Sequence, residues 1–159
     1  MKGKIAVTPR SLSRHGHPAL EALARAGYEV VFPTPGRQPT RDELAAFLPD
    51  CVGYLAGVEP IPAAVLAHCH NLKVISRNGV GVDNVDLHAA EAMGIAVEKA
   101  AGANARGVAE LAITLMLAGL RHVPWSDQQL KQGGWSRQEG IEVSGRTLGV
   151  CLLYTSRCV

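Results

Sequence analysis

Hydrophobic residues up to Val97 come in short runs that alternate with segments of helical periodicity. Five runs of apolar and β-branched residues predict strands at 4–7, 28–32, 52–58, 72–76 and 94–97. Between them, helices are predicted over 17–26, from Thr40, over 62–69 and over 86–93. Because parallel neighbours require crossover connections, this alternation predicts an α/β fold, with a parallel sheet and helices on both of its faces.

Local signals mark where two of these helices begin or end. Gly27 follows the helix over 17–26, at the position where a left-handed residue commonly ends a helix. Thr40 and Glu43 form the capping-box pattern that begins the next helix. Open parallel sheets bind ligands at the carboxyl ends of their strands. We therefore expect functional residues in the loops 8–13, 56–60 and 77–84.

The pattern changes from Asn104 onward. Residues 108–123 predict a long helix that is apolar on nearly every face, so we expect other protein to enclose it and the helix to link two packed bodies. A polar amphipathic segment follows at 125–135, and residues 145–150 read as the first strand of a second domain. This predicts a domain over 1–100, and a long helix and the start of a second domain over 101–150.

Composition and charge exclude several classes of protein. The chain has 159 residues, of which 47% are hydrophobic, enough to bury a core without disulfides or a metal ion. A net charge of +2 without any basic run argues against nucleic acid as the main partner. The longest apolar stretch, 108–120, is shorter than the roughly 20 residues that cross a bilayer, and the N-terminus shows no signal core. We expect no membrane partner and a cytoplasmic location.

Histidines close together in the sequence give only weak metal-ligand patterns. His15 and His17 form one such pair, and His68 and His70 form the other. Ligands two residues apart need further partners to complete a zinc site, and the neighbouring sequence offers no such set. We therefore expect no metal.

Residues 76–86, with the sequence S-R-N-G-V-G-V-D-N-V-D, are the most informative stretch. They follow a predicted buried strand at its carboxyl end, and Gly79 and Gly81 carry no side chains that would keep a ligand from the backbone. Successive N–H groups in such a loop form a positive concavity suited to a carboxylate or a phosphate. A glycine-rich tight turn without a ligand is the alternative interpretation.

This stretch and three others together resemble the D-isomer-specific 2-hydroxyacid dehydrogenases. The others are Y-L-A-G-V-E-P-I at 54–61, A-G-A-N at 101–104 and V-A-E-L-A at 108–112, and their order and spacing match the family. Phosphoglycerate dehydrogenase and hydroxypyruvate or glyoxylate reductases are the most similar subgroups. The resemblance implies a flavodoxin-like substrate domain, a Rossmann domain that binds NAD or NADP, a small 2-hydroxy or 2-keto acid as substrate, and a homodimer for the full-length protein.

The resemblance also implies roles for individual residues. The backbone amides of Val80 and Gly81 would hold the substrate carboxylate, and Ala56 and Gly57 would form a second substrate-facing loop. Val80 would also lie near the nicotinamide, and Val108 matches a position that touches the cofactor. Some phosphoglycerate dehydrogenases carry an Arg where Ala56 and Gly57 stand, to pair with a phosphate. The missing charge argues against a phosphorylated substrate.

The family's catalytic Arg, Glu and His follow the dinucleotide glycines, so no catalytic residue is assigned here. No glycine follows Gly149, which excludes a pyrophosphate-binding turn after it. We expect an N-terminal fragment that is inactive alone, with Asn104 at its interdomain hinge or as a helix cap. Residues 151–159 depart from the family pattern, and we expect a non-native tail that matches two joined transposon ends. The alternative is a stand-alone flavodoxin-like binding or regulatory module.

Overall fold

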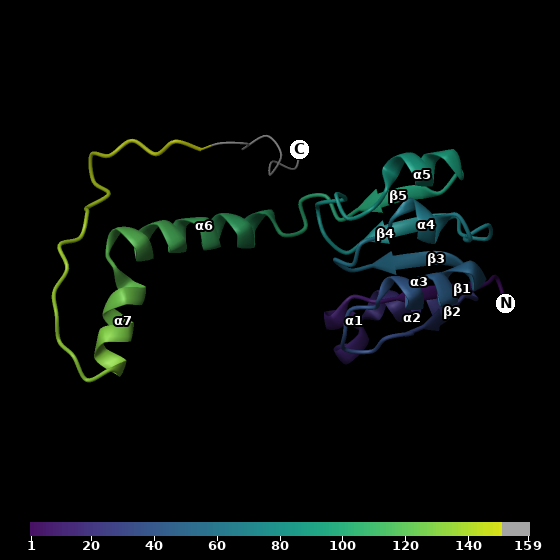
Figure 1. Ribbon diagram of the computed structural model, residues 1–159, viewed down its shortest axis with the longest axis horizontal. Coiled ribbons are helices and arrows are strands. Elements are labelled where there is room, and N and C mark those ends of the chain that lie inside the picture. The colour runs from purple at the N-terminus through teal and green to yellow at the C-terminus, as the bar shows by residue number, and fades with distance from the viewer. Residues whose placement is uncertain (151–159) are drawn as a thin grey trace. The chain divides into compact units, whose positions relative to one another are not determined.

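The computed structural model describes residues 1–150, and the predicted non-native tail over 151–159 lies outside the described residues. The chain divides into two compact units, which we call the first unit, Met1–Ala101, and the second unit, from Gly102 onward (Figure 1). The first unit contains every strand of the described structure, and the second contains its longest helix.

A five-stranded parallel sheet forms the centre of the first unit. Its strands are β1 (Lys4–Val7), β2 (Glu29–Val31), β3 (Cys51–Ala56), β4 (Val74–Arg77) and β5 (Ala96–Lys99). Their order across the sheet is β2-β1-β3-β4-β5, and every neighbouring pair is parallel. These pairings confirm the predicted parallel sheet of an α/β fold. The strand order is that of flavodoxin-like folds.

Helices connect the strands of the first unit. They are α1 (Arg10–His15), α2 (Pro18–Arg25), α3 (Arg41–Phe47), the 3₁₀ helix η1 (Leu48–Asp50), α4 (Ala63–Leu66) and α5 (Leu87–Ala92). From β1 to β2 the chain moves toward one edge of the sheet. From β2 to β3, β4 and β5 it moves toward the opposite edge. Because parallel crossovers are right-handed, α2 lies on one face and α3, α4 and α5 lie on the other. Contacts of α4 with both α3 and α5 agree with this arrangement.

The local signals of the sequence correspond to real helix boundaries. Gly27 ends the α2 segment with a φ of +93°. The capping box at α3 is complete, because Thr40 and Glu43 each accept a hydrogen bond from the other's backbone N–H. Asp86 caps α5 by accepting a hydrogen bond of 3.0 Å from the Ala89 amide. Helix α1 is the exception, since it lies in a segment predicted to be a loop.

The core of the first unit is aliphatic and packs between the sheet and its helices. Side chains from β3 and β4, such as Tyr54 and Ile75, are at most 1% exposed. Cys51 and Cys69 are also buried and act as small hydrophobic residues. Burial raises the pKa of both thiols, that of Cys69 to about 11.

The second unit contains α6 (Ala105–Leu120) and α7 (Val123–Lys131). His122, between them, has a left-handed φ of 53°, which ends the long helix before the position that the sequence predicts. We expected this helix to be enclosed, but no α6 residue is buried within the described part of the chain. Within the second unit its apolar residues are at most partly covered, as Met116 and Leu120 are.

The strand predicted over 145–150 does not form in the described structure. Residues Ser144 and Gly145 make a turn, and the residues from Arg146 to Val150 pair with no strand. A parallel strand needs a neighbour for its backbone hydrogen bonds, and the described residues of this unit provide none.

In residues 1–150, no helix combines the length and apolar character that crossing a membrane requires.

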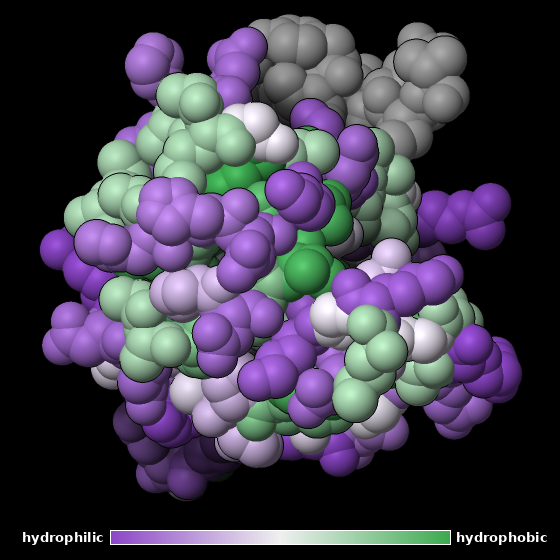
Figure 2. All heavy atoms as spheres, turned by 90° about the vertical axis from the view of Figure 1, so that its right-hand side faces the viewer, coloured by the Kyte–Doolittle hydropathy of each residue, from purple (hydrophilic) through white to green (hydrophobic). Residues whose placement is uncertain are grey.

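Figure 2 views the side of the molecule on which the strands of the first unit begin. Hydrophilic and hydrophobic residues are intermixed on this face, and the most hydrophobic ones show near its centre. Ligands of open parallel sheets bind at the opposite ends of the strands. The candidate site is therefore sought where the strands end.

Candidate functional site

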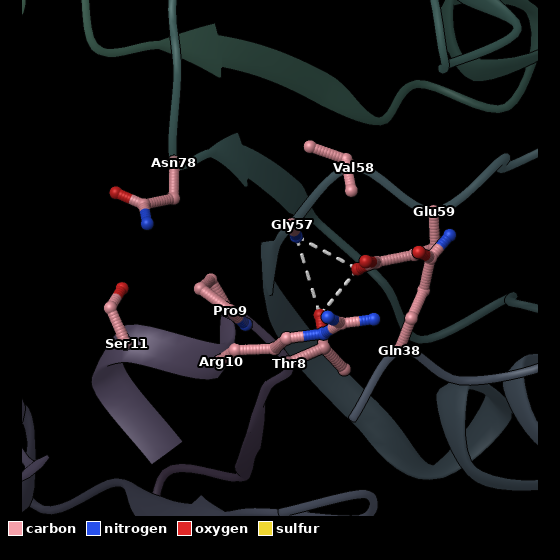
Figure 3. Close-up of a pocket in the computed structure, with 9 residues that line it drawn as sticks. All are labelled: Thr8, Pro9, Arg10, Ser11, Gln38, Gly57, Val58, Glu59 and Asn78. Atoms are coloured by element: carbon pink, nitrogen blue, oxygen red, sulfur yellow. Dashed lines mark hydrogen bonds between the residues drawn. The ribbon is translucent and has the colours of Figure 1, made fainter. Parts of the chain in front are cut away.

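A pocket of about 470 Å³ lies at the carboxyl ends of the central strands. Three loops line it, with Thr8–Ser11 following β1, Gly57–Glu59 following β3, and Asn78 following β4 (Figure 3). Gln38 completes the lining. The neighbours β1 and β3 form the point where the strand order reverses, which is where open α/β sheets bind ligands. The structure thus brings together the three loops that the sequence singles out.

Glu59 is the centre of a buried hydrogen-bond network on one side of this pocket, which we call the Glu59 network. Its side chain is 1% exposed, and its Oε1 accepts hydrogen bonds from the hydroxyls of Thr8 and Tyr54. The Gly57 amide donates to the same oxygen at 2.8 Å, and to the Thr8 hydroxyl at 3.3 Å. Three donors, from β3 and from the loops after β1 and β3, therefore converge on a single carboxylate oxygen.

The buried carboxylate affects the nearby phenol of Tyr54. Burial, and next the charge of Glu59, raise the pKa of Tyr54 far above its usual range. The phenol therefore remains a hydrogen-bond donor at any pH at which the protein is studied. Tyr54 is thus a permanent donor to Glu59, and both residues hold the loop after β3 in one conformation.

Asn84 ties the loop after β3 to the loop after β4. Its amide nitrogen donates to the carbonyl of Glu59 at 2.8 Å and to that of Gly57 at 3.4 Å. Its side-chain oxygen accepts a hydrogen bond of 3.1 Å from Nε of Arg77. A further bond of 2.7 Å joins the Ile61 amide to the Asn84 carbonyl. The two loops that the resemblance assigns to the substrate therefore form one cross-linked structure.

Val80 and Gly81 present unpaired backbone donors in the loop after β4. Among residues 1–150, neither amide donates a hydrogen bond to another atom of the chain. Val80 is partly buried and Gly81 is exposed, so both amides can reach a ligand or water. The adjacent Gly79 amide is turned inward to the Arg77 carbonyl, at 2.8 Å. Two neighbouring unpaired N–H groups are suited to binding a carboxylate.

The other predicted site residues have different surroundings. Ala56 is fully buried at the end of β3, and its carbonyl accepts a hydrogen bond of 2.9 Å from the Asn78 amide. The amide of Gly57 is already taken by Thr8 and Glu59, so it is not a free donor. Val108 is 47% exposed and belongs to α6, in the second unit. Asn104 stands at the N-cap of α6, but its side chain makes no capping hydrogen bond.

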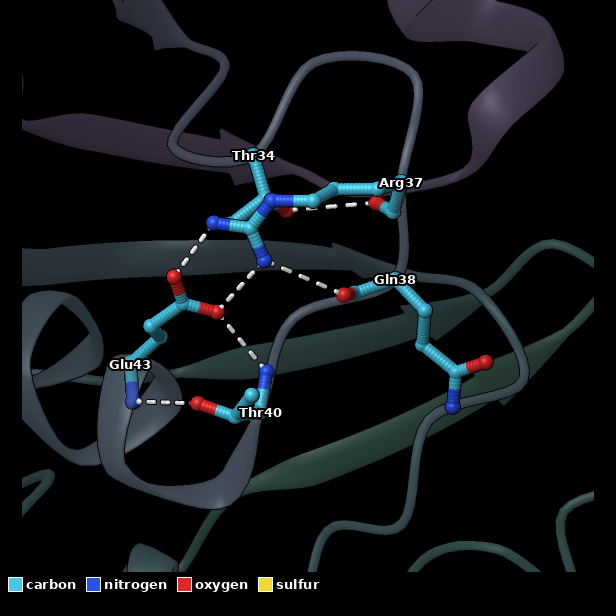
Figure 4. A network of polar contacts seen from close by, with 5 residues as sticks. All are labelled: Thr34, Arg37, Gln38, Thr40 and Glu43. Atoms are coloured by element: carbon cyan, nitrogen blue, oxygen red, sulfur yellow. Dashed lines mark hydrogen bonds and ion pairs between the residues drawn. The ribbon is translucent and has the colours of Figure 1, made fainter.

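A second polar network holds the loop that carries Gln38 (Figure 4). The Arg37 guanidinium donates to both carboxylate oxygens of Glu43 and, at 3.3 Å, to the Gln38 carbonyl. The Thr34 hydroxyl donates to the Arg37 carbonyl at 3.4 Å. The hydrogen bond from Arg37, followed by that from the Thr40 amide, lowers the pKa of Glu43 to about 2. These contacts join the loop to the start of α3.

Several residues at the site were not identified from the sequence. Arg10 and Gln38 line the pocket, and Thr8 and Glu59 both line it and form its polar wall. The only signal for Glu59 is an acidic residue directly after a predicted buried strand, between Val58 and Pro60. Such a residue is common in solvated loops, and its burial becomes evident only once the fold places β1 beside β3.

The glycines of the loop after β4 do not fit the pyrophosphate of a dinucleotide. A methyl group at Gly79 would lie 2.5 Å from Nη1 of Arg77, so this glycine faces the Arg77 guanidinium and not an open cradle. At Gly81 the same test meets Oδ1 of Asp83 at 2.7 Å, and a carboxylate repels phosphate. Among the described residues, no cluster of His, Cys, Asp and Glu is placed to hold a metal ion.

Comparisons with known proteins agree on one family. Residues 7–157 match the family model described as "D-isomer specific 2-hydroxyacid dehydrogenase, catalytic domain". The chain is 39% identical over 135 residues to D-3-phosphoglycerate dehydrogenase of Archaeoglobus fulgidus, covering 83% of this chain and 25% of that protein. It is also 39% identical over 113 residues to hydroxypyruvate reductase of Thermotoga maritima, covering 70% of this chain and 37% of that protein.

A solved structure shows the same similarity in three dimensions. The crystal structure of NAD⁺-bound 3-phosphoglycerate dehydrogenase from Entamoeba histolytica matches with a TM-score of 0.68 and 27% identity. The match covers 89% of this chain and 43% of that one. This chain therefore spans less than half the length of each of these three relatives.

Proposed function

The chain belongs to the D-isomer specific 2-hydroxyacid dehydrogenase family, and from this premise we propose that it forms the substrate-binding part of an NAD-dependent D-2-hydroxyacid dehydrogenase. The reaction of such an enzyme oxidises the CH–OH group of a small 2-hydroxy acid, or reduces the corresponding 2-keto acid. The observation that carries the proposal is the pair of unpaired amides at Val80 and Gly81. They do not line the pocket themselves, but they belong to the loop after β4, whose Asn78 lines it.

In this proposal the first unit binds the acid through its carboxylate. The N–H groups of Val80 and Gly81 donate to the two carboxylate oxygens, and Ala56 and Gly57 shape the opposite loop. Asn84 fixes the distance between these loops, because it is hydrogen-bonded to both of them. The chain's own contribution is therefore to hold and orient the acid, with little reorganisation when the acid binds.

The proposal also includes a cofactor and a partner for the complete enzyme. NAD is the hydride acceptor that such an enzyme uses, and the NAD⁺-bound relative supports this choice. We assign apolar contacts with the cofactor to Val80 and Val108, from the family resemblance. A homodimer of the full-length protein belongs to the same proposal.

Heteronuclear NMR of the 159-residue chain tests the carboxylate site. We expect D-lactate to shift the amide signals of Val80 and Gly81 in a saturable manner, because both N–H groups gain an acceptor. The signal of Gly94, in the turn between α5 and β5, is the internal control and stays unchanged. Lactamide, which has the same skeleton without the charge, is the chemical control. Equal shifts from lactate and lactamide, or none from either, would refute the proposal.

A further inference from the structure

Glu59 presents one carboxylate oxygen that the protein leaves unpaired. All three donors of the Glu59 network bind Oε1, and Oε2 accepts no hydrogen bond from residues 1–150. A methyl group built on Gly57 would lie 2.7 Å from Oε2. This oxygen therefore faces the backbone of the loop that the proposed function assigns to the substrate.

The network also fixes the direction in which that oxygen points. Oε1 is held by the hydroxyls of Thr8 and Tyr54 and by the Gly57 amide, so the carboxylate plane cannot turn without breaking several hydrogen bonds. Glu59 is 1% exposed as a residue and still lines the pocket (Figure 3). An oriented acceptor at the wall of a pocket favours a ligand group that donates a hydrogen bond.

We propose that Glu59 makes this pocket select an acid with an uncharged hydroxyl beyond carbon 2, and makes it discriminate against a phosphate at the same place. This inference rests on the proposed function. A hydroxyl can donate to Oε2, whereas a phosphate brings like charge against a buried carboxylate that water screens poorly. The loop itself offers no compensating cation, because residues 56–61 include neither Lys nor Arg.

Arg10 is the cation that lines the same pocket, and its position is compatible with this selectivity. Its side chain is exposed and extends across the pocket in Figure 3, and within residues 1–150 it forms no ion pair with Glu59. An exposed guanidinium attracts any anionic acid, whether or not it is phosphorylated. Glu59 is buried beside the loop, so it acts at short range on the group that lies against Gly57.

The test compares three acids on the full chain by NMR titration of the Val80 and Gly81 amides. D-Glycerate has the second hydroxyl, D-lactate lacks it, and 3-phosphoglycerate carries a phosphate in its place. We expect D-glycerate to bind at least about fivefold more tightly than D-lactate and about tenfold more tightly than 3-phosphoglycerate, as one charge-assisted hydrogen bond allows.

Glu59→Gln is the matching variant, because it keeps one oxygen for the three donors and replaces the other with an NH₂ group. We expect the preference for D-glycerate over 3-phosphoglycerate to fall by about tenfold. Glu91→Gln, on the exposed surface of α5, is the control for removing a negative charge and leaves the preference unchanged. If the Glu59 variant does not fold, the order of the three acids on the wild-type chain still decides the proposal.

The outcomes separate this inference from the proposed function. If none of the acids shifts the Val80 and Gly81 amides, the carboxylate site itself is wrong. If all three shift them with equal affinity, or if Glu59→Gln folds and keeps the wild-type preference, the carboxylate site stands and the role of Glu59 is refuted.

Discussion

Replacing Tyr54 with Phe removes one hydroxyl from the Glu59 network and leaves the ring in place. Tyr54 is 1% exposed, and its ring packs edge-on against Phe47 with the centroids 6.3 Å apart, so Phe fills the same volume. The lost hydroxyl donates to Glu59 and lies 3.1 Å from the Thr8 hydroxyl. The substitution therefore deletes a hydrogen bond to a carboxylate without opening a cavity.

The expected loss of stability depends on the hydrogen bonds that the Glu59 carboxylate retains in the variant. A hydrogen bond to a charged group contributes about 1.5–3 kcal/mol to stability. Thr8 and Gly57 still donate to Glu59 in the variant, so we expect the lower part of this range, about 1.5–2 kcal/mol. For a domain of this size, 1 kcal/mol lowers Tm by about 4–8 °C, and the expected decrease is about 6–16 °C.

Urea unfolding followed through the amide signals of β3 measures this loss. A probe that averages over the whole chain would combine the first and second units, whereas β3 reports on the first unit alone. Tyr28→Phe is the matched control, because the Tyr28 hydroxyl forms no hydrogen bond within the described residues. We expect the control to change stability by less than about 0.5 kcal/mol. An equal effect of both substitutions, at an unchanged m value, would refute the reasoning.

Three further predictions concern the loops and the cap of α3. Asn84→Asp replaces the donor that ties the loops with an oxygen that faces two carbonyls, and we expect a loss of about 1–3 kcal/mol in urea unfolding. Asp83→Asn removes a negative charge beside Gly81, so we expect D-lactate to bind about fivefold more tightly by NMR, and unchanged affinity would contradict this. Hydrogen bonds from Arg37 and then from the Thr40 amide lower the pKa of Glu43 from 4.5 to about 2, so the stability that this carboxylate contributes is present above about pH 4.5 and lost as the pH falls toward 2. Acid unfolding of Glu43→Gln lacks this pH-dependent loss.

Local sequence signals were sufficient for most of the first unit. The capping box at Thr40 and the glycine at position 27 are interactions within a few residues, so their sequence patterns correspond directly to structure. The five strands were predicted within a few residues of their observed bounds, because each is a short apolar run. Once the sheet is parallel, its carboxyl edge necessarily collects the loops after β1, β3 and β4.

The Glu59 network could not be predicted in the same way. Glu59 and Thr8 are 51 residues apart, and only the pairing of β1 with β3 brings them together. Nor does the sequence show that the Gly57 amide is already occupied. The long helix was predicted, whereas the enclosure expected for it stays a prediction, since the burial of an apolar helix depends on what packs against it. The sequence therefore predicts which loops form the site, but not which of their atoms are free to bind a ligand.

The strand order also has a consequence for how the isolated chain behaves at high concentration. β2 and β5 are the two outer strands of the sheet, so each has one side without a partner strand in residues 1–150. β2 is only three residues long and begins with the exposed Glu29, and β5 ends with the exposed Glu98 and Lys99. Short, charged outer strands disfavour the addition of a strand from another molecule. The sheet is thus protected against edge-to-edge aggregation at the millimolar protein concentrations that NMR titrations use.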